Sequence, residues 1–291
     1  MPLIRVDTPR PALRWPWRAR PAAWLAALAV ALLLPGLAGA ADEPSAETEQ
    51  WAGVRQFLFA DRPIADGRGD VVELDAPFRA EDAAVVPIGL KAKADQTPGR
   101  YIRKMWLVVD KNPTPIAASF ELTPESGRAD IETRIRLEEY TWVRVIAETS
   151  DGTLHMARKF VRAAGGCSAP AGKDMEAALA RLGKVKFKLE GDVQQGKPTL
   201  AQVMVSHPNN SGMQMDQVTR LYVPPHYVRR VEVAYAGKVI LTADVDFSIS
   251  ENPNFRFYFL PQAGGSELTA KVLDSKDLTF TSTLSVGKTG T

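Results

Sequence analysis

Cysteine and histidine are nearly absent from this sequence. Its 291 residues include one cysteine, Cys167, and three histidines, His155, His207 and His226. A single cysteine cannot form a disulfide within its own chain, and these residues do not have the spacing of a zinc site. The sequence therefore predicts neither internal disulfides nor a metal centre.

Other chemical signatures are also missing. No glycine-rich loop leads into a helix, as a phosphate-binding site requires, and the scattered carboxylates form no obvious pair for general acid–base catalysis. No basic patch with interleaved aromatic residues suggests nucleic-acid binding. The sequence predicts no cofactor, no nucleic-acid partner and no enzyme active site.

Residues 1–40 have the pattern of an export signal. Five arginines and one acid, Asp7, accompany the apolar run AAWLAALAVALLLPGLAGA, which ends in Ala38-Gly39-Ala40. A basic head, an apolar centre and small residues at the end are typical of a cleaved signal peptide. The alternative is an N-terminal membrane anchor, because a span needs roughly 18–20 apolar residues. After cleavage we expect no membrane attachment.

Removal of this segment reverses the sign of the net charge. Lys+Arg falls from 36 to 31 and Asp+Glu from 34 to 33, so +2 becomes −2. An exported protein meets oxidising conditions in which most thiols pair. A lone Cys167 must then be buried and inert, cross-linked to another chain, or used chemically.

Most of the remaining chain alternates between apolar and polar residues in short runs. Alternation with a period of two predicts strands with one buried face, and turn residues separate the runs. The clearest examples in the first half are KMWLVVD (104–110), IAASFELT (116–123), DIETRIRL (130–137) and TWVRVIAET (141–149).

A second strand-rich block begins near Val185. VRRVEVAYAGKVILTADV predicts a hairpin that turns at Ala236-Gly237, and the phenylalanines of FRFYFLP (255–261) alternate onto one face that should be buried. Many short strands and few helical segments predict an all-β protein with two β-sandwiches. We expect the two sandwiches to pack through apolar sheet faces.

The composition changes between the two blocks. Residues 163–173 are rich in Ala, Gly, Ser and Pro, and residues 173–183 predict a short helix that ends at Gly183. The predicted organisation is a signal peptide (1–40), a sandwich (41–162), an arm with a linker helix (163–183) and a second sandwich (184–291).

Cys167 lies on this arm. Its commonest role would be that of a small buried apolar residue, but the neighbouring glycines provide no core, and each histidine has a plainer structural explanation than service as its base. We therefore expect an exposed thiol with a pKa near the ordinary ~8.5. Flexibility would come from Gly165, Gly166 and Gly172, and Cys167→Ser should change stability by no more than about 0.5 kcal/mol. Such an arm suits delivery of a covalently held group.

The sequence also resembles a known family. Its first block is similar to SoxY, the substrate-carrying subunit of bacterial thiosulfate oxidation, and its second block is similar to SoxZ. The resemblance covers roughly residues 70–286 and rests on the combination of Asp110-Lys111-Asn112-Pro113, Ser150-Asp151-Gly152, Gly165-Gly166-Cys167, His207-Pro208 with Gly212, and Asn252-Pro253 with Phe255 and Phe257. The fused order is similar to that of quinoprotein dehydrogenase-associated SoxYZ-like carriers.

The resemblance implies two immunoglobulin-like sandwiches and a periplasmic carrier that is not itself an enzyme. By position, Cys167 would hold a sulfur compound covalently while partner enzymes process it. Two features depart from the family pattern: the arm reads GGCSAPAG instead of GGCGG, and it is tethered at both ends.

Other functions remain open from the sequence. The chain could be a non-covalent adaptor or binding module of a periplasmic quinoprotein dehydrogenase, or a thiol enzyme such as a peroxidase. A disulfide-linked dimer through Cys167 is a further alternative.

Overall fold

The computed structural model describes residues 43–66, 69–170, 175–263 and 266–287. The predicted signal peptide and Gly172 lie outside these ranges. Ser45–Thr291 form one compact unit, which contains every helix and strand of the described residues. In the described part of the chain, no helix is both long enough and apolar enough to cross a membrane.

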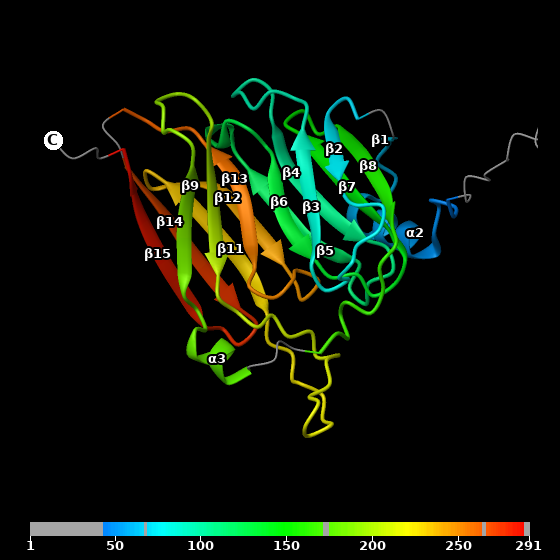
Figure 1. The fold of residues 1–291 in the computed structure, drawn as a ribbon. Coiled ribbons are helices and arrows are strands. Elements are labelled where there is room, and N and C mark those ends of the chain that lie inside the picture. Colours follow the sequence, from blue (N-terminus) through cyan, green and yellow to red (C-terminus); the bar gives the residue numbers. More distant parts are fainter. Residues whose placement is uncertain (1–42, 67–68, 171–174, 264–265, 288–291) are drawn as a thin grey trace, which may run out of the picture. The chain divides into compact units, whose positions relative to one another are not determined.

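The fold is all-β, as the alternating runs predict (Figure 1). Eight strands precede the junction: β1 (Ile64–Asp66), β2 (Val72–Asp75), β3 (Val86–Ala92), β4 (Ile102–Val109), β5 (Ile116–Leu122), β6 (Ile131–Ile135), β7 (Thr141–Thr149) and β8 (Leu154–Val161). Seven strands follow it: β9 (Val185–Glu190), β10 (Thr199–Val205), β11 (Val228–Tyr235), β12 (Lys238–Val245), β13 (Asn254–Phe259), β14 (Ser266–Asp274) and β15 (Thr279–Val286). The described helical segments are α2 (Glu49–Phe59), the 3-10 turn η1 (Pro124–Ser126) and α3 (Met175–Ala180).

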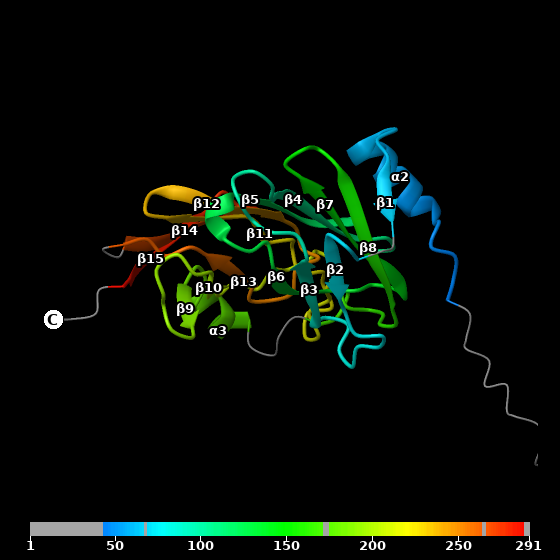
Figure 2. The same ribbon diagram turned by 90° about the horizontal axis from the view of Figure 1, so that it is seen from above.

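The strands form two sheets that face each other as two layers (Figure 2). One sheet has nine strands in the order β1-β8-β7-β4-β5-β12-β11-β14-β15. The other has six in the order β2-β3-β6-β13-β10-β9. Each sheet therefore contains strands from both halves of the sequence.

The two halves meet edge to edge, and the expected packing through sheet faces is wrong. β12 pairs antiparallel with β5, from Leu241 opposite Leu122 to Val245 opposite Ala118. In the second layer, Arg256 of β13 pairs with Glu132 of β6. Edge strands present unpaired backbone N–H and C=O groups, and pairing across the junction satisfies them while it extends both sheets.

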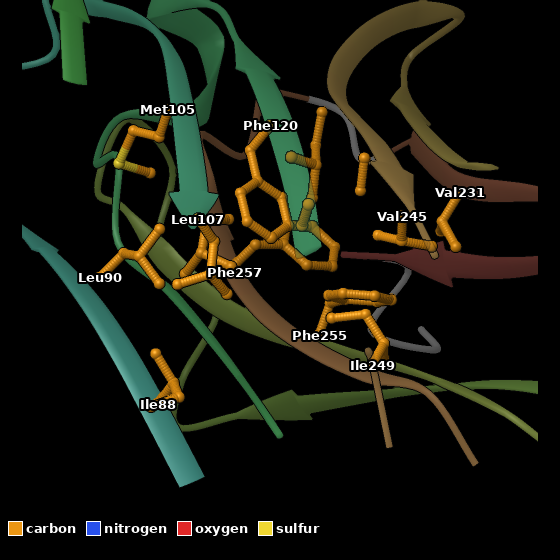
Figure 3. Close-up of a cluster of buried hydrophobic side chains, with 14 of the residues drawn as sticks. Ile88, Leu90, Met105, Leu107, Phe120, Val231, Val245, Ile249, Phe255 and Phe257 are labelled. Atoms are coloured by element: carbon orange, nitrogen blue, oxygen red, sulfur yellow. The ribbon is translucent and has the colours of Figure 1, made fainter. Parts of the chain in front are cut away.

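The apolar core continues across this junction. Phe120 of β5 and Phe255 of β13 belong to different halves and different layers, and their ring centroids lie 6.1 Å apart in an edge-to-face arrangement (Figure 3). Phe255, Phe257 and Phe259 are at most 1% exposed, which confirms the prediction made from their alternation. The β11–β12 hairpin also turns where it was expected, with positive φ at Ala236 and Gly237.

The helix α2 was not expected from the sequence. Trp51, Val54 and Phe59 on its inner side pack against the outer face of the nine-stranded sheet, where Trp106 and Ile146 meet them. Thr48 caps the first turn by accepting a hydrogen bond from the Trp51 N–H at 3.0 Å. The helix covers a sheet face whose apolar residues would otherwise meet water.

A shorter helix forms where one was predicted. Only Met175–Ala180 are α-helical, and the chain then turns until Gly183, whose φ is +76°. Glycine adopts this left-handed conformation without strain. Leu179 is 50% exposed, so the predicted apolar face of this helix is only partly covered.

Candidate functional site

Cys167 lies in a tight turn that follows β8. Its residue is 0% exposed, so the expectation of an exposed thiol is wrong in this structure. The turn lies against the segment between β6 and β7. The Gly165 N–H donates to the Glu138 carbonyl and the Gly166 N–H to the Leu137 carbonyl, both at 2.8 Å.

The two glycines that precede the cysteine serve this close packing. Gly165 has φ +81°, a conformation that side-chain-bearing residues rarely adopt. A Cβ atom on Gly166 would lie 2.0 Å from the Ala83 carbonyl oxygen. The sequence predicted that these glycines provide flexibility. In the docked turn they are required because a side chain at either position would be strained or would clash. Gly172 lies outside the described residues.

The Glu138 side chain holds the outer side of the turn. Its Oε2 accepts hydrogen bonds from the Cys167 N–H at 2.9 Å and the Ser168 N–H at 3.2 Å, and its Oε1 accepts from the Ser168 hydroxyl at 2.9 Å. One carboxylate thus binds two consecutive backbone donors and a side chain. Bonds of this charge-assisted kind are stronger than neutral ones.

The second half of the chain holds the other side of the turn. The buried Ser211 hydroxyl donates to the Cys167 carbonyl oxygen at 2.6 Å. Ser211 is itself fixed by its neighbours, because its N–H donates to Gln214 Oε1 and its Oγ accepts from the Met213 N–H. The cysteine therefore lies where the two halves meet.

Arg136 lies near the Cys167 turn, and its side chain bonds to the second half of the chain across the same junction. It is 2% exposed, and its Nη1 donates to the carbonyls of Asn209, Phe247 and Ile249, each at 2.8 Å. Its buried Nε has no hydrogen-bond partner. Arg136 is thus a buried cation held by backbone dipoles and electrostatically coupled to Cys167.

Asn112 explains why the Asp110-Lys111-Asn112-Pro113 motif matters to this site. Its Nδ2 donates to the Arg136 carbonyl at 2.8 Å and to Ser248 Oγ at 3.0 Å. Its Oδ1 accepts from the Glu138 N–H at 3.0 Å. One buried amide therefore fixes the backbone from which both Arg136 and Glu138 extend.

The surroundings of Cys167 disfavour its ionised form. Burial raises the pKa of the thiol to about 12, and the negative charges of Glu138 and Asp246 act in the same direction, while Arg136 opposes them. The expected pKa near the ordinary value is therefore wrong for the docked turn. Because the thiolate is the nucleophile, Cys167 is chemically quiet in this position.

Asp246 is a second perturbed group near the junction. Burial raises the pKa of its carboxyl to about 7, although hydrogen bonds from Ser248 and the charge of Arg136 act in the opposite direction. Its Oδ2 is buried and has no hydrogen-bond partner. Asp246 therefore titrates near neutral pH next to the cysteine turn.

His207 and His226 form a separate buried cluster with Asp274. The Nε2 atoms of His226 and His207 lie 2.7 Å and 3.5 Å from Asp274 Oδ2. Both histidines, His207 and His226, are buried, at 1% and 4% exposed. His155, on β8, pairs with Ala65 of β1 and is half-buried.

The ligand atoms of this cluster are close enough for a metal ion, within 4.8 Å of one another. However, His207 Nδ1 accepts a hydrogen bond from the Asn209 N–H at 3.0 Å. In neutral imidazole the proton then resides on Nε2, so Nε2 has no lone pair for a metal. Burial, followed by repulsion from His226, lowers the pKa of His207 to about 4. The arrangement favours a hydrogen-bonded cluster that supports the loop carrying Ser211.

Cys167 was predicted as a site residue from the sequence, but the residues that surround it were not. Arg136, Glu138 and Asp246 belong to strand ends and loops with no distinctive chemical pattern. Asn112 and the pair His207 and Asn252 did belong to the motifs of the family resemblance. Asn252 Oδ1 accepts from the His207 N–H at 3.3 Å, so these motifs support the backbone around the cysteine.

Comparisons with known proteins match both halves of the fold. The family model "Sulfur oxidation protein SoxY" matches residues 55–167, and the model "Sulphur oxidation protein SoxZ" matches residues 187–285. The SoxY match ends at Cys167 itself. No curated protein matches the chain.

Several solved structures are similar in part. The sulfur carrier protein SoxY from Chlorobium limicola f thiosulfatophilum is 20% identical with a TM-score of 0.33, over 39% of this chain and 94% of that one. A superoxide reductase (neelaredoxin) from Ignicoccus hospitalis is 13% identical with a TM-score of 0.29, over 32% and 79%. A β-glycosidase from Bacteroides vulgatus is 9% identical with a TM-score of 0.22, over 75% and 25%. The family assignment depends on the two family models.

The two family models match successive parts of the all-β fold, so the chain combines the two domains of a sulfur-oxidation carrier family. The chain belongs to the SoxY/SoxZ family and contains both of its domains. This confirms the resemblance of the two blocks to SoxY and SoxZ. Members of this family are carriers that work with sulfur-oxidising enzymes.

Proposed function

We propose that this protein is a periplasmic carrier that holds a sulfur-containing group covalently on Cys167 and presents it to partner enzymes. The observation that carries the proposal is the position of the only cysteine, at the end of the SoxY match and at the junction with the SoxZ domain. No histidine among the described residues hydrogen-bonds to Cys167, which supports a carrier more than a thiol enzyme. The export pattern of residues 1–40 supports the periplasmic location.

Attachment can occur by thiol–disulfide exchange. The Cys167 thiolate attacks one sulfur of an S–S bond, a new S–S bond forms at Cys167, and the departing sulfur takes the electron pair of the broken bond. The exchange is balanced without an added oxidant. It requires Cys167 to leave its buried position, because neither the cargo nor a partner can reach a thiol that is 0% exposed.

Exposed apolar residues in segments on both sides of Cys167 in the sequence support contact with partner enzymes. Single exposed apolar residues are ordinary, but a group of them often marks an interaction surface. The segment that follows Glu138 and the segments that follow Cys167 in the sequence contribute exposed large apolar side chains: Tyr140, Leu179, Val218, Leu221 and Tyr222.

A second candidate is favoured by the burial of the thiol. A protonated, enclosed cysteine would suit a non-covalent adaptor for a periplasmic quinoprotein dehydrogenase, in which Cys167 only completes the packing. In that case the protein would bind the dehydrogenase through its surface and carry no adduct.

Intact-mass measurement of protein purified from its native periplasm tests the proposal. The carrier predicts a mass increase that maps to Cys167, disappears on treatment with a reducing thiol and is absent from Cys167→Ser. An unmodified thiol in cells that actively oxidise sulfur compounds would contradict the carrier. If that unmodified protein co-purified with a quinoprotein dehydrogenase, the adaptor would replace it.

A further inference from the structure

The turn that contains Cys167 is held by a small set of contacts from both halves of the protein. Glu138 binds the Cys167 N–H, the Ser168 N–H and the Ser168 hydroxyl. Ser211 binds the Cys167 carbonyl from the opposite side. Two backbone bonds, from Gly165 and Gly166, complete the docking.

We propose that Glu138 and Ser211 form a latch that keeps Cys167 retracted, and that Cys167 reacts only when these contacts open. Both are positioning residues, because each acts through the backbone of the turn. This regulation of the site rests on the proposed carrier function. It adds that the protein exists in a closed, protected state and an open, reactive state.

The latch can open without unfolding of the sandwich. Glu138 is half-buried and Ser168 is exposed, so water can replace their hydrogen bonds. The apolar core lies between the sheets, and the turn follows the last strand of the first half. Segments with few buried apolar contacts open at a lower free energy than core strands do.

Opening changes the chemistry of the thiol as well as its access. The closed thiol has a pKa of about 12, raised first by burial and then by the charge of Glu138. A water-exposed thiol ordinarily titrates near 8.5, so the thiolate fraction at neutral pH rises roughly three-thousandfold on release. The closed state thereby protects Cys167 from unrelated disulfides and oxidants.

Arg136 gives the closed position a further feature. This buried guanidinium is coupled to Cys167 and has an unpartnered Nε. Its bonds to Asn209 and Ile249 belong to the junction and do not depend on the turn. When the latch opens, the Arg136 guanidinium stays in place, and the turn can return to its position beside this buried cation.

The latch can be tested on the purified, cargo-free protein with a neutral dipyridyl disulfide. Hydrogen bonds to charged groups contribute about 1.5–3 kcal/mol, and 1.4 kcal/mol corresponds to a factor of ten in an equilibrium. Glu138→Ala should therefore accelerate labelling of Cys167 by tenfold or more, and Ser211→Ala by about fivefold. Glu139→Ala is the matched control, because Glu139 pairs with Lys111 and does not touch the turn. It should label within about twofold of the wild-type rate.

Hydrogen exchange separates opening from a mere change in charge. Loss of the Glu138 carboxylate also lowers the thiol pKa and removes the acceptor of the Cys167 N–H. Only opening exposes the N–H groups of Gly165 and Gly166, because their acceptors are backbone carbonyls. Their exchange should be slow in the wild type and faster in Glu138→Ala and Ser211→Ala. Melting temperatures of the variants show whether the fold is intact.

Two results would overturn the latch. One is fast exchange of the Gly165 and Gly166 N–H groups in the wild type, which decides the matter even if a variant fails to fold. The other is labelling and exchange in both folded variants at the wild-type rate. Failure of the carrier function is a different result, because it is read from the absence of a native adduct.

Discussion

The SoxY half contains two buried arginines that are stabilised in different ways. Arg144 is fully buried and bonds to both carboxylate oxygens of Asp110, at 2.8 Å and 2.7 Å. Thr48 adds a hydrogen bond to the same carboxylate, and the guanidinium lies 4.6 Å from the centre of the Trp51 ring. This centre is charge-balanced and attaches α2 to the sheet.

Arg136 is almost as deeply buried but bonds to three backbone carbonyls and to no carboxylate. Its titratable neighbours are Cys167, Glu251 and Asp246. The Arg144 cation is therefore paired with a carboxylate, whereas the Arg136 cation has backbone partners and lies near titratable groups. The Arg144 centre stabilises the fold, whereas the Arg136 centre lies at the candidate functional site.

The largest expected effect comes from breaking the buried ion pair between Asp110 and Arg144. Asp110→Ala removes both bonds to Arg144 and leaves a buried cation unpaired, which typically costs about 3–5 kcal/mol. We expect the denaturant midpoint to fall accordingly. Asp75→Ala, which breaks the exposed pair with Lys91, should leave the midpoint almost unchanged. Equal losses in the two variants would contradict the distinction between the two environments.

A pH-dependent effect should distinguish the second centre. The pKa of Asp246 is about 7 in the folded protein and has a reference value of 3.8, so between these values the native state binds more protons than the unfolded state. Its contribution to stability is therefore complete below pH ~4 and is lost as pH rises through 7. Asp246→Asn should match the wild type near pH 4 and exceed it by ~2 kcal/mol above pH 7. The full pKa shift would give a larger difference, at 1.36 kcal/mol per pKa unit. We expect a smaller value because Asp246 keeps some contact with water.

Urea titrations of both proteins from pH 4 to pH 8 measure this difference. His207 contributes the opposite trend, since its lowered pKa makes stability fall as pH drops from 6.5 towards 4. That trend is common to both proteins and cancels in the comparison. A stability difference independent of pH would show that Asp246 does not titrate in this range.

The smallest expected effect concerns the thiol itself. Cys167→Ser replaces a weakly polar buried group with a hydroxyl that needs hydrogen bonds, which should cost about 1 kcal/mol. This is more than an exposed arm predicts. Thermal unfolding of the reduced wild type and the variant measures the difference, with Glu139→Ala as a control that loses only an exposed ion pair. No difference between Cys167→Ser and the wild type would indicate that the closed turn is seldom populated.

Much of the fold could be predicted from local patterns. The strands predicted at 104–110, 116–123 and 141–149 lie nearly at their observed positions, because alternation records which face of a strand is buried. The turn at Ala236-Gly237 was also predicted correctly from its residues. The helix α2 was missed, since its sequence EQWAGVRQFLF follows no distinct start signal except Thr48.

The candidate site was only partly predictable. Cys167 could be identified because it is unique, but its burial depends on residues that are distant in the sequence. Glu138 is 29 positions away and Ser211 is 44 positions away. Glycine and proline around the cysteine favoured an extended arm, yet the same glycine that gives flexibility also permits the close approach of Gly166 to Ala83.

The sequence by itself determined the all-β class, most strand positions, the buried phenylalanines of β13 and the single thiol, because each depends on side-chain chemistry and spacing along the chain. Only the tertiary structure decided that the two halves share both sheets and that the cysteine turn is docked. Edge pairing uses backbone groups that every residue carries, so strand sequences do not specify which edges meet. The docking of Cys167 depends on that pairing, because the junction brings Arg136, Glu138 and Ser211 to the same turn.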